Sequence, residues 1–279
     1  MVKHVILDTD IGGDPDDAFA LLLGMNSPEI NIDMIVTSDE HRGHRAEFAR
    51  KFLERFKVDI PVVKGNDLGN SKCCVVCDLV KDETSSSAYL PKIREIVQNN
   101  PKTYYVCISP QTNLASFLDY APDLIPKLEV VIMGGAINYR KKDRAEHNVK
   151  YDVNAARKVF GSNADMRWVL SDTTFNPNLE IDEEHPIYKR LRDSDFSAKE
   201  LLLKNCQNFF GRLHPSTIMH DPLTLSYVIR PEFLTFEEKR LDIDKYGKVH
   251  LSEEGRPIKV STNAEYKKFM NFFSQRLPF

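Results

Sequence analysis

The sequence has no long uninterrupted run of apolar residues and no strong excess of either charge. No apolar stretch in the 279 residues reaches the length that crosses a bilayer. The N-terminus leads straight into an expected strand, so we predict no signal peptide, no membrane partner and a cytoplasmic location. The formal net charge is only −3, and basic and acidic residues are mixed along the chain, which does not favour nucleic-acid binding.

Cysteine is also scarce, with five residues in the chain, an odd number. A disulfide framework is therefore not expected, and the sequence favours a reducing compartment. Cys73, Cys74 and Cys77 are clustered, whereas Cys107 and Cys206 stand apart. A zinc site at the cluster would need a second C-x2-C or a histidine pair, and the cluster lacks both, so we predict free thiols.

Ordinary proportions of apolar (42%) and charged (28%) residues indicate a globular protein. Strand patterns alternate with helical patterns up to about residue 170, which predicts an α/β fold with a mainly parallel, doubly wound (Rossmann-like) sheet. The expected strands cover residues 5–7, 32–37, 60–63, 104–108, 130–133 and 168–170. The expected helices cover residues 18–23, 41–56, 88–98, 112–120 and 154–160, and residues 65–86 are expected to form a polar loop.

The pattern changes from about residue 197. Two helical segments, 197–213 and 223–229, precede short antiparallel strands within 234–260 and a final amphipathic helix at 263–276. We find no repeat, no low-complexity tract and no linker, so we predict a single domain over residues 1–279 with a C-terminal helical and antiparallel section.

The most informative stretch is HVILDTDIGGDPDDAFALLLG, residues 4–24. An apolar strand is followed by a loop that glycines and a proline keep irregular, and Asp16 or Asp17 is expected to cap the next helix. Such a loop lies at the carboxyl ends of the strands, where ligands bind. Convergent carboxylates suit Ca²⁺ or Mg²⁺, and the alternative is a solvated acidic loop. The loop holds five aspartates: Asp8, Asp10, Asp14, Asp16 and Asp17.

The segment DTDIGGDPDDA resembles the N-terminal signature of the inosine-uridine-preferring nucleoside hydrolases, whose usual form is D-x-D-P-G-x-D-D-A. This chain has two extra residues within that loop. Residues 65–90 hold no counterpart of the family's H-G-[ED]-x-G segment. Four further segments resemble family motifs in order and spacing: TNLA at 112–115, VIMGG at 131–135, AEHN at 145–148 and HDP at 220–222.

The resemblance implies Ca²⁺-dependent hydrolysis of the N-glycosidic bond of a ribonucleoside or related riboside, in a homo-oligomer that we expect to be a dimer or tetramer. It also implies that Asp10 is the base that activates the attacking water. The implied metal ligands are Asp10, Asp17, Asp221 and the backbone carbonyl of Ile108. The implied ribose contacts are Asp16, Glu146, Asn148, Asp39 in place of a family Asn, and the backbone at Met133 near the 5′ side.

The chemistry suits these residue types. Cleavage of the C1′–N bond builds positive charge on the ribose, which carboxylates stabilise. The departing base needs a proton, and His220 is the predicted donor, with a packing or capping histidine as the alternative. Asp8 is expected to be structural and to bond backbone amides behind the site.

A basic run, Arg140-Lys141-Lys142-Asp143-Arg144, follows the VIMGG motif, and Arg140 stands where the family has an Asn. These cations predict binding of a 5′-phosphate on the substrate; the alternative is a solvated loop.

Two other functions are compatible with the sequence. One is a haloacid-dehalogenase-type phosphatase, which also carries D-x-D after its first strand. The other is a nucleoside-binding homologue with impaired catalysis.

Overall fold

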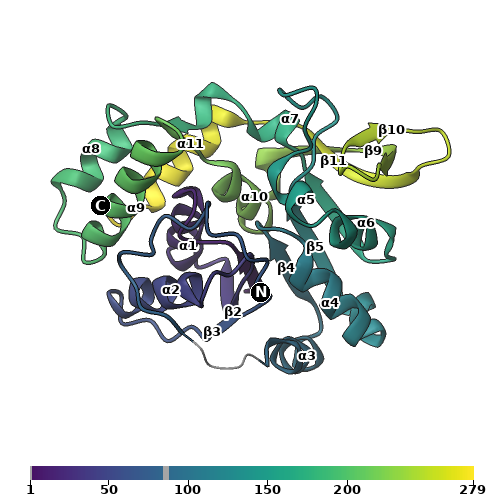
Figure 1. The fold of residues 1–279 in the computed structure, drawn as a ribbon, viewed down its shortest axis with the longest axis horizontal. Coiled ribbons are helices and arrows are strands. Elements are labelled where there is room, and N and C mark those ends of the chain that lie inside the picture. The colour runs from purple at the N-terminus through teal and green to yellow at the C-terminus, as the bar shows by residue number, and fades with distance from the viewer. Residues whose placement is uncertain (1, 84–87) are drawn as a thin grey trace.

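A nine-stranded sheet forms the centre of the computed structural model, which describes residues 2–83 and 88–279 (Figure 1). The strand order is β10-β9-β11-β6-β5-β4-β1-β2-β3, and all neighbours from β11 to β3 are parallel. β9 is antiparallel to β11 and β10. The strands are β1 Lys3–Thr9, β2 Ile30–Thr37, β3 Val62–Lys64, β4 Thr103–Cys107, β5 Leu128–Met133, β6 Asp165–Val169, β9 Leu234–Ile243, β10 Val249–Leu251 and β11 Arg256–Ala264.

Helices cover both faces of the sheet, because successive residues of each buried strand point to opposite sides. In β1, Val5 and Leu7 belong to one apolar core and Ile6 to the other. The first core is completed by α1 Asp16–Met25, α2 His44–Glu54, α8 Pro186–Asp193, α9 Lys199–Arg212, α10 His220–Ile229 and α11 Tyr266–Arg276. The second is completed by α3 Tyr89–Asn99, α4 Thr112–Tyr120, α5 His147–Tyr151 and α6 Val153–Gly161.

Short elements complete the chain. A second, two-stranded antiparallel sheet pairs β7 (Glu180–Ile181) with β8 (Thr217–Ile218). In Figure 1, α8, α9 and α11 gather at one end of the molecule, and the β9–β10 hairpin projects at the other. The remaining elements are α7 Ser171–Thr174 and the 3-10 helices η1 Pro122–Lys127, η2 Pro177–Leu179 and η3 Pro231–Phe233. None of the helices in the described part of the chain is both long and apolar enough to cross a membrane.

The strand order confirms the predicted doubly wound α/β fold. From β1 the chain moves outward to β2 and β3, and then returns to the opposite side of β1 to form β4, β5 and β6. This reversal between β1 and β4 leaves a crevice outside the carboxyl ends of the strands, where ligands bind in open α/β sheets. The acidic loop leaves β1 at this crevice.

Several predicted boundaries differ from the structure; α10, for example, begins at residue 220 and not at 223. Three of the differences have a clear local reason. α2 begins at residue 44 because residues 41–43 form a turn that the amide of His44 closes on the carbonyl of His41 at 3.0 Å. Pro15, not an aspartate, occupies the cap position of α1, because the helix already begins at Asp16 and both aspartates lie in its first turn. β9 and β11 are ten and nine residues long, and β11 runs to residue 264, so α11 begins only at 266.

The structure also fills segments that the sequence left open. Residues 171–196, for which we made no assignment, hold α7, η2, β7 and α8. The expected polar loop contains no helix or strand over residues 65–83, and its last three residues lie outside the described residues.

Candidate active site

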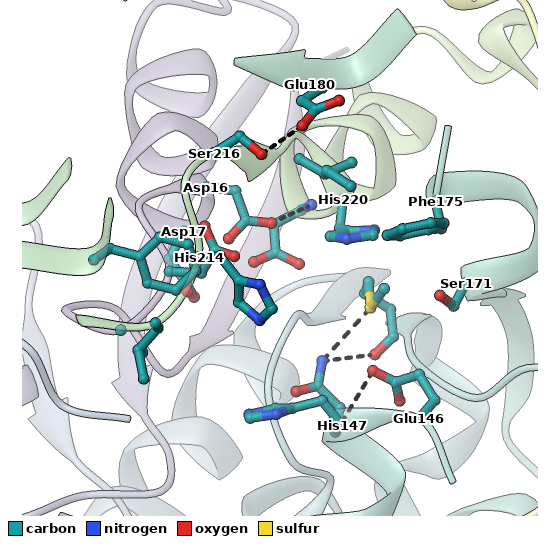
Figure 2. Close-up of a pocket in the computed structure, with 18 of the residues that line it drawn as sticks. Asp16, Asp17, Glu146, His147, Ser171, Phe175, Glu180, His214, Ser216 and His220 are labelled. Atoms are coloured by element: carbon teal, nitrogen blue, oxygen red, sulfur yellow. Dashed lines mark hydrogen bonds between the residues drawn. The ribbon is translucent and has the colours of Figure 1, made fainter. Parts of the chain in front are cut away.

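Three carboxylates meet at the carboxyl end of β1. Asp16 and Asp17 lie in the first turn of α1, and Asp221 lies in the first turn of α10, which packs beside α1. The amide of Asp221 donates to Oδ2 of Asp16 at 3.3 Å. The three side chains offer oxygens that all lie within 4.8 Å of one another, and the residues are only 4%, 3% and 5% exposed. We call these three residues the acidic group (Figure 2).

Burial and mutual repulsion dominate the electrostatics of the acidic group. Burial raises the pKa of Asp16 well above its ordinary value, and the charges of Asp14 and Asp17 raise it further. The pKa of Asp221 is raised by burial and then by Asp16 and Asp17. A bound hard cation would relieve both effects, because it supplies the opposite charge and replaces water as the partner of the oxygens. The donor set therefore fits Ca²⁺.

The acidic group faces a cavity of about 610 Å³ that also holds the other motif residues. Figure 2 shows Asp16 and Asp17 on one side of this space and Glu146 on the other. The lining includes every predicted site residue except Asp39: Asp10, Asp16, Asp17, Ile108, Met133, Arg140, Glu146, Asn148, His220 and Asp221. The tight group of oxygens contains Asp16, which the resemblance assigns to ribose, whereas Asp10 lies beside the group in the same lining.

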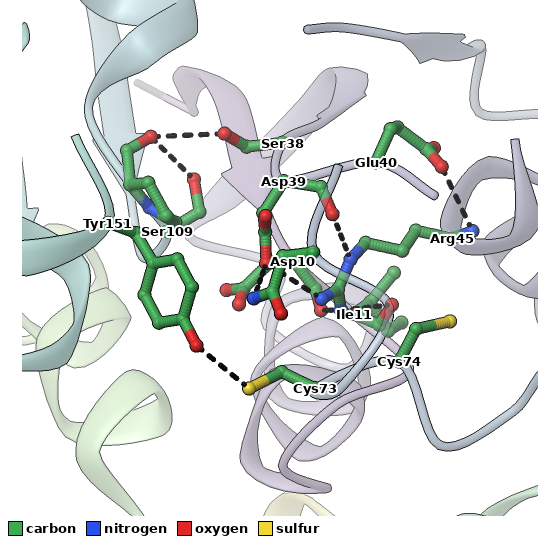
Figure 3. Close-up of polar contacts among 12 residues, drawn as sticks. Asp10, Ile11, Ser38, Asp39, Glu40, Arg45, Cys73, Cys74, Ser109 and Tyr151 are labelled. Carbon is green, nitrogen blue, oxygen red and sulfur yellow. Dashed lines mark hydrogen bonds and ion pairs between the residues drawn. The ribbon is translucent and has the colours of Figure 1, made fainter. Parts of the chain in front are cut away.

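Asp39 lies outside the lining and is paired with a buried arginine (Figure 3). Its Oδ2 accepts from Nη2 of Arg45 at 3.1 Å and from Nδ2 of Asn70 at 2.7 Å. Both Asp39 and Arg45 are completely buried. Burial raises the pKa of Asp39 to about 6, although the charge of Arg45 opposes the increase.

Arg45 also holds the acidic loop in place. Its guanidinium donates to the backbone carbonyls of Asp10, of Ile11 at 3.3 Å and of Asp39 at 2.8 Å. One buried cation thus satisfies backbone acceptors of two loops that follow neighbouring strands. Arg45 was not predicted from the sequence, because nothing in its spacing shows that α2 brings it beneath the loop after β1.

Glu146 and Asn148 are fixed by the backbone around α5. The carboxylate of Glu146 caps the helix and accepts from the amides of Gly135 at 2.8 Å, Asn148 at 3.1 Å and Val149 at 3.2 Å. Nδ2 of Asn148 donates to the carbonyl of Met133 at 3.2 Å. The AEHN motif is thereby tied to the end of β5.

His220 and Arg140 both contact one aromatic ring, that of Phe175. The ring of His220 stacks on Phe175 with centroids 6.3 Å apart, and the guanidinium of Arg140 lies 4.1 Å from the centroid of Phe175. Nδ1 of His220 is 2.7 Å from Oγ1 of Thr174. Burial, together with the charges of Arg140 and His147, lowers the pKa of His220 to about 3, so the imidazole is neutral near pH 7.

Several lining residues were not predicted. The lining also contains Cys73, Phe175, Asn176, His147 and His214. His147 lies inside the AEHN motif, which is a signal that could have identified it. The other four come from segments without a recognised motif, and only the fold brings them to the cavity.

Asp8 lies behind the cavity, as expected, but with different partners. Its carboxylate accepts from Tyr105 Oη at 2.8 Å, Asn113 Nδ2 at 3.0 Å and Ser109 Oγ at 3.1 Å. The expectation of backbone amide donors is therefore wrong, because side chains of β4, of α4 and of the loop between them reach the carboxylate first. Burial raises the pKa of Asp8 to about 7, while these three hydrogen bonds oppose the increase.

Comparison with known proteins identifies the family. The profile of the inosine-uridine preferring nucleoside hydrolases matches residues 5–271. The chain is 25% identical to the pyrimidine-specific ribonucleoside hydrolase RihA of Escherichia coli O127:H6, over 100% of this chain and 99% of that protein. Its fold is similar to that of an inosine-guanosine nucleoside hydrolase (TM-score 0.83, 19% identity, covering 100% and 99% of the two chains). It is also similar to a purine-preferring ribonucleoside hydrolase from Gardnerella vaginalis (TM-score 0.81, 22% identity, covering 99% and 98%).

These comparisons confirm the resemblance that the sequence motifs indicate. The matched region begins in β1 and ends in α11, so it includes the acidic loop and Asp221. The chain therefore belongs to the family of inosine-uridine preferring nucleoside hydrolases, which are enzymes that hydrolyse the N-glycosidic bond of nucleosides.

Proposed function

We propose that this protein is a Ca²⁺-dependent hydrolase of ribonucleosides or closely related ribosides. Water adds its hydroxyl to C1′ of the ribose, the C1′–N bond breaks, and the base leaves with a proton. The observation that supports this proposal best is the shared cavity. The acidic group lies in it together with Asp10, Glu146 and Asn148, at the carboxyl end of the sheet.

The acidic residues provide the ligands for the cation. Asp10, Asp17, Asp221 and the Ile108 carbonyl are the proposed set, and all four residues line the cavity. Asp16 is the alternative to Asp10 as a ligand, because its carboxylate lies within the tight group. When bound, Ca²⁺ supplies positive charge that orients the ribose diol and lowers the pKa of water.

The protein's own side chains then perform distinct tasks. Asp10 accepts a proton from the attacking water. Asp16, Glu146 and Asn148 hold the ribose hydroxyls, and the carboxylates stabilise the positive charge that develops on the ring. A contact between Asp39 and the ribose stays a prediction. Oδ1 of Asp39 is buried and has no hydrogen-bond partner among the described residues.

The departing base meets the imidazole of His220, which is neutral before the reaction. We propose that His220 still contacts the departing base through a hydrogen bond. A neutral imidazole whose Nδ1 accepts from Thr174 carries its proton on Nε2, and that N–H can hydrogen-bond to a base nitrogen. His147 and His214 are the other imidazoles of the cavity that can pass a proton to the base.

The relatives differ in their base, since their names specify pyrimidine, inosine and guanosine, or purine nucleosides. The proposal therefore leaves the base open. Membership of the family removes the basis for the phosphatase alternative. A cytoplasmic location and a homo-oligomeric state stay predictions.

The test is a panel of purine and pyrimidine ribonucleosides incubated with the Ca²⁺-saturated protein, with free ribose and free base measured together. We expect equimolar release of both from at least one nucleoside, and no release by Asp221→Asn. Asp67→Asn, a change at an exposed loop residue, is the control and should keep full activity. Tight binding without release of base would support the impaired homologue instead.

A further inference from the structure

A second group of metal-ligating side chains lies outside the cavity. His41, His44 and Cys77 offer ligand atoms that all lie within 4.8 Å of one another. Cys74 lies next to these three residues, because its Sγ is 3.3 Å from Sγ of Cys77. The histidines come from the turn that begins α2, and the cysteines come from the long connection between β3 and α3. We call these four residues the histidine–cysteine group.

A tight turn brings the two histidines together. The chain turns at Arg42 (φ 57°) and Gly43 (φ 76°), and the amide of His44 bonds to the carbonyl of His41 at 3.0 Å. A side chain at Gly43 is excluded, because a Cβ there would lie 2.6 Å from the carbonyl oxygen of Glu83. Two left-handed residues in succession are typical of a type I′ turn, which places its first and last residues side by side.

The cysteine segment is anchored independently. The amide of Val75 donates to the carbonyl of Gly12 at 2.8 Å, and Nδ2 of Asn208 donates to the carbonyl of Val75 at 2.8 Å. All the cysteines are free, and the distance between the Cys74 and Cys77 sulfurs exceeds that of a disulfide. Two sulfurs bound to one tetrahedral zinc lie about 3.8 Å apart, so a small adjustment suffices.

The strongest indication of a ligand is the imidazole of His44. This residue is buried, and its Nδ1 has no hydrogen-bond partner among residues 2–83 and 88–279. Its other nitrogen, Nε2, lies 2.7 Å from Oδ1 of Asp82. Asp82 therefore fixes the proton on Nε2 and leaves the lone pair of Nδ1 free. Metal-ligating histidines are oriented in this way by a carboxylate on the opposite ring nitrogen.

We propose that His41, His44, Cys74 and Cys77 bind one Zn²⁺ ion as a structural site. The spacing is H-x2-H followed by C-x2-C, and two imidazoles with two thiolates form a closed tetrahedral set. Sulfur and nitrogen ligands select against Ca²⁺, which takes oxygen ligands, so the site is chemically distinct from the acidic group. The sequence analysis overlooked this site because it did not pair the two histidines.

The location gives the ion a structural task. Arg45, which supports the acidic loop and Asp39, follows His44 directly in α2, and Cys73 of the cavity lining directly precedes Cys74 (Figure 3). A Zn²⁺ ion would join these two segments, which otherwise are linked here by hydrogen bonds and packing. The ion would thereby restrict one wall of the cavity without contacting substrate.

The test counts zinc on the complete, reduced protein with Ca²⁺ in excess to occupy the acidic group. After dialysis against Zn²⁺ with a weak chelator, elemental analysis should find one Zn²⁺ per chain. Co²⁺ in its place should give the charge-transfer absorption of thiolate ligands. Cys77→Ser and His41→Ala should weaken zinc binding at least about a hundredfold, and Asp82→Asn about 10- to 100-fold.

Matched controls separate this proposal from the proposed function. Cys73→Ser removes a thiol of the same segment that lies 3.3 Å from Tyr151 Oη, and it should keep the zinc. Asp221→Asn should lose hydrolysis and keep the zinc. The proposal is overturned if reduced wild-type protein takes up no zinc, or if Cys73→Ser loses as much zinc as Cys77→Ser. The cobalt spectrum is measured on wild-type protein, so it decides the matter even where a variant does not fold.

Discussion

The aspartates of the first loop have the same side chain but different surroundings. Asp8 is held by three side-chain donors behind the cavity, whereas Asp16 and Asp17 face each other and Asp221 across the space for a cation. Asp14 is bonded to the hydroxyl of Thr217. Substitutions within this one loop should therefore have separable effects.

Asp10→Ala should abolish turnover and weaken Ca²⁺ binding, because the proposed base and a proposed ligand are lost together. Calorimetric titration with Ca²⁺ and a ribose-release assay measure the two effects on the same preparation. Asp67→Asn, at an exposed loop residue, is the control and should keep Ca²⁺ affinity. Full activity of Asp10→Ala in the presence of a chelator would contradict both roles.

His220→Ala should slow hydrolysis of natural nucleosides by about two to four orders of magnitude, the usual contribution of a proton-transferring group. An aryl riboside with an activated leaving group needs no protonation, so its rate should fall much less. The measurement is kcat for both substrates in wild type and variant. Equal losses on the two substrates would instead assign His220 a packing role beside Phe175.

Arg140→Ala tests the prediction of a 5′-phosphate on the substrate. Arg140 and Lys141 line the cavity, and of these Arg140 is held against Phe175. If Arg140 binds the phosphate, wild type should favour a nucleoside 5′-monophosphate, and the variant should lose about 10- to 100-fold of that preference in kcat/KM. Arg144→Ala, at an exposed residue of the same run, should leave the preference unchanged. A wild-type preference for the neutral nucleoside would rule the idea out.

Ten of the eleven site residues predicted from the sequence line the cavity, because local patterns such as D-x-D and AEHN mark the ends of strands. Arg45 and His214 could not be predicted, because their roles depend on which segments lie side by side after folding. The histidine pair at 41 and 44 was missed for a related reason: its partners lie about thirty residues further along the chain, in a segment without periodicity.

At the scale of elements, two helix caps at the same edge of the molecule have different partners. Glu146 caps α5 and also bonds to Gly135 at the end of β5, on the wall of the cavity. Asp152 caps α6 through the amide of Ala155 at 2.9 Å and accepts from Thr112 Oγ1 at 2.8 Å. The two carboxylates are therefore comparable as caps and differ in their access to substrate.

Glu146→Ala and Asp152→Ala should each lower the free energy of unfolding by about 1–2 kcal/mol, the usual cost of a lost cap. Only Glu146→Ala should also change the kinetics, because only Glu146 is proposed to hold a ribose hydroxyl. Urea denaturation and kcat/KM, measured on both variants, separate the two contributions. An equal loss of kcat/KM in both would show that activity follows α5 and α6 as a unit.

Alternating strands and helices were predictable up to about residue 170, because each is long enough to show its period. The elements between residues 171 and 196 were not assigned; three of them, α7, η2 and β7, have four or fewer residues and so carry no period. The parallel pairing of β11 with β6 could not be predicted either. It joins residues about ninety positions apart, and the local pattern of β11 indicates only its antiparallel partner β9.

At the scale of the whole molecule, the raised pKa values link stability to pH and to cations. Burial raises the pKa values of Asp8 and Asp14 to about 7, and those of Asp16, Asp17 and Asp221 are raised as well. Without a bound cation, the folded chain therefore holds protons on these carboxyl groups more tightly than the unfolded chain does. Protonation of these carboxyl groups therefore adds to the free energy of unfolding. This addition is greatest at low pH and is lost as the pH rises from about 4 through 7.

Saturating Ca²⁺ should raise the Tm at pH 7.5 by about 5–10 °C, as expected for a ligand at roughly a hundred times its Kd. The increase should be much smaller at pH 5, because protons then compete for the same oxygens. Differential scanning calorimetry with Ca²⁺ or with chelator, at both pH values, measures the difference. Asp221→Asn should remove it, and an equal increase at both pH values would contradict carboxylate ligation.

The acidic group joins one helix made early in synthesis to one made late. Asp16 and Asp221 are 205 residues apart. Ribosomes add roughly 5 to 20 residues per second, so Asp221 follows Asp16 by about 10 to 40 seconds. Throughout that interval a nascent chain carries the first two carboxylates of the group without the third. The proposed Ca²⁺ site would therefore be complete only after Asp221 has been added, and occupancy of the ion would report that the last third of the chain has folded onto the first.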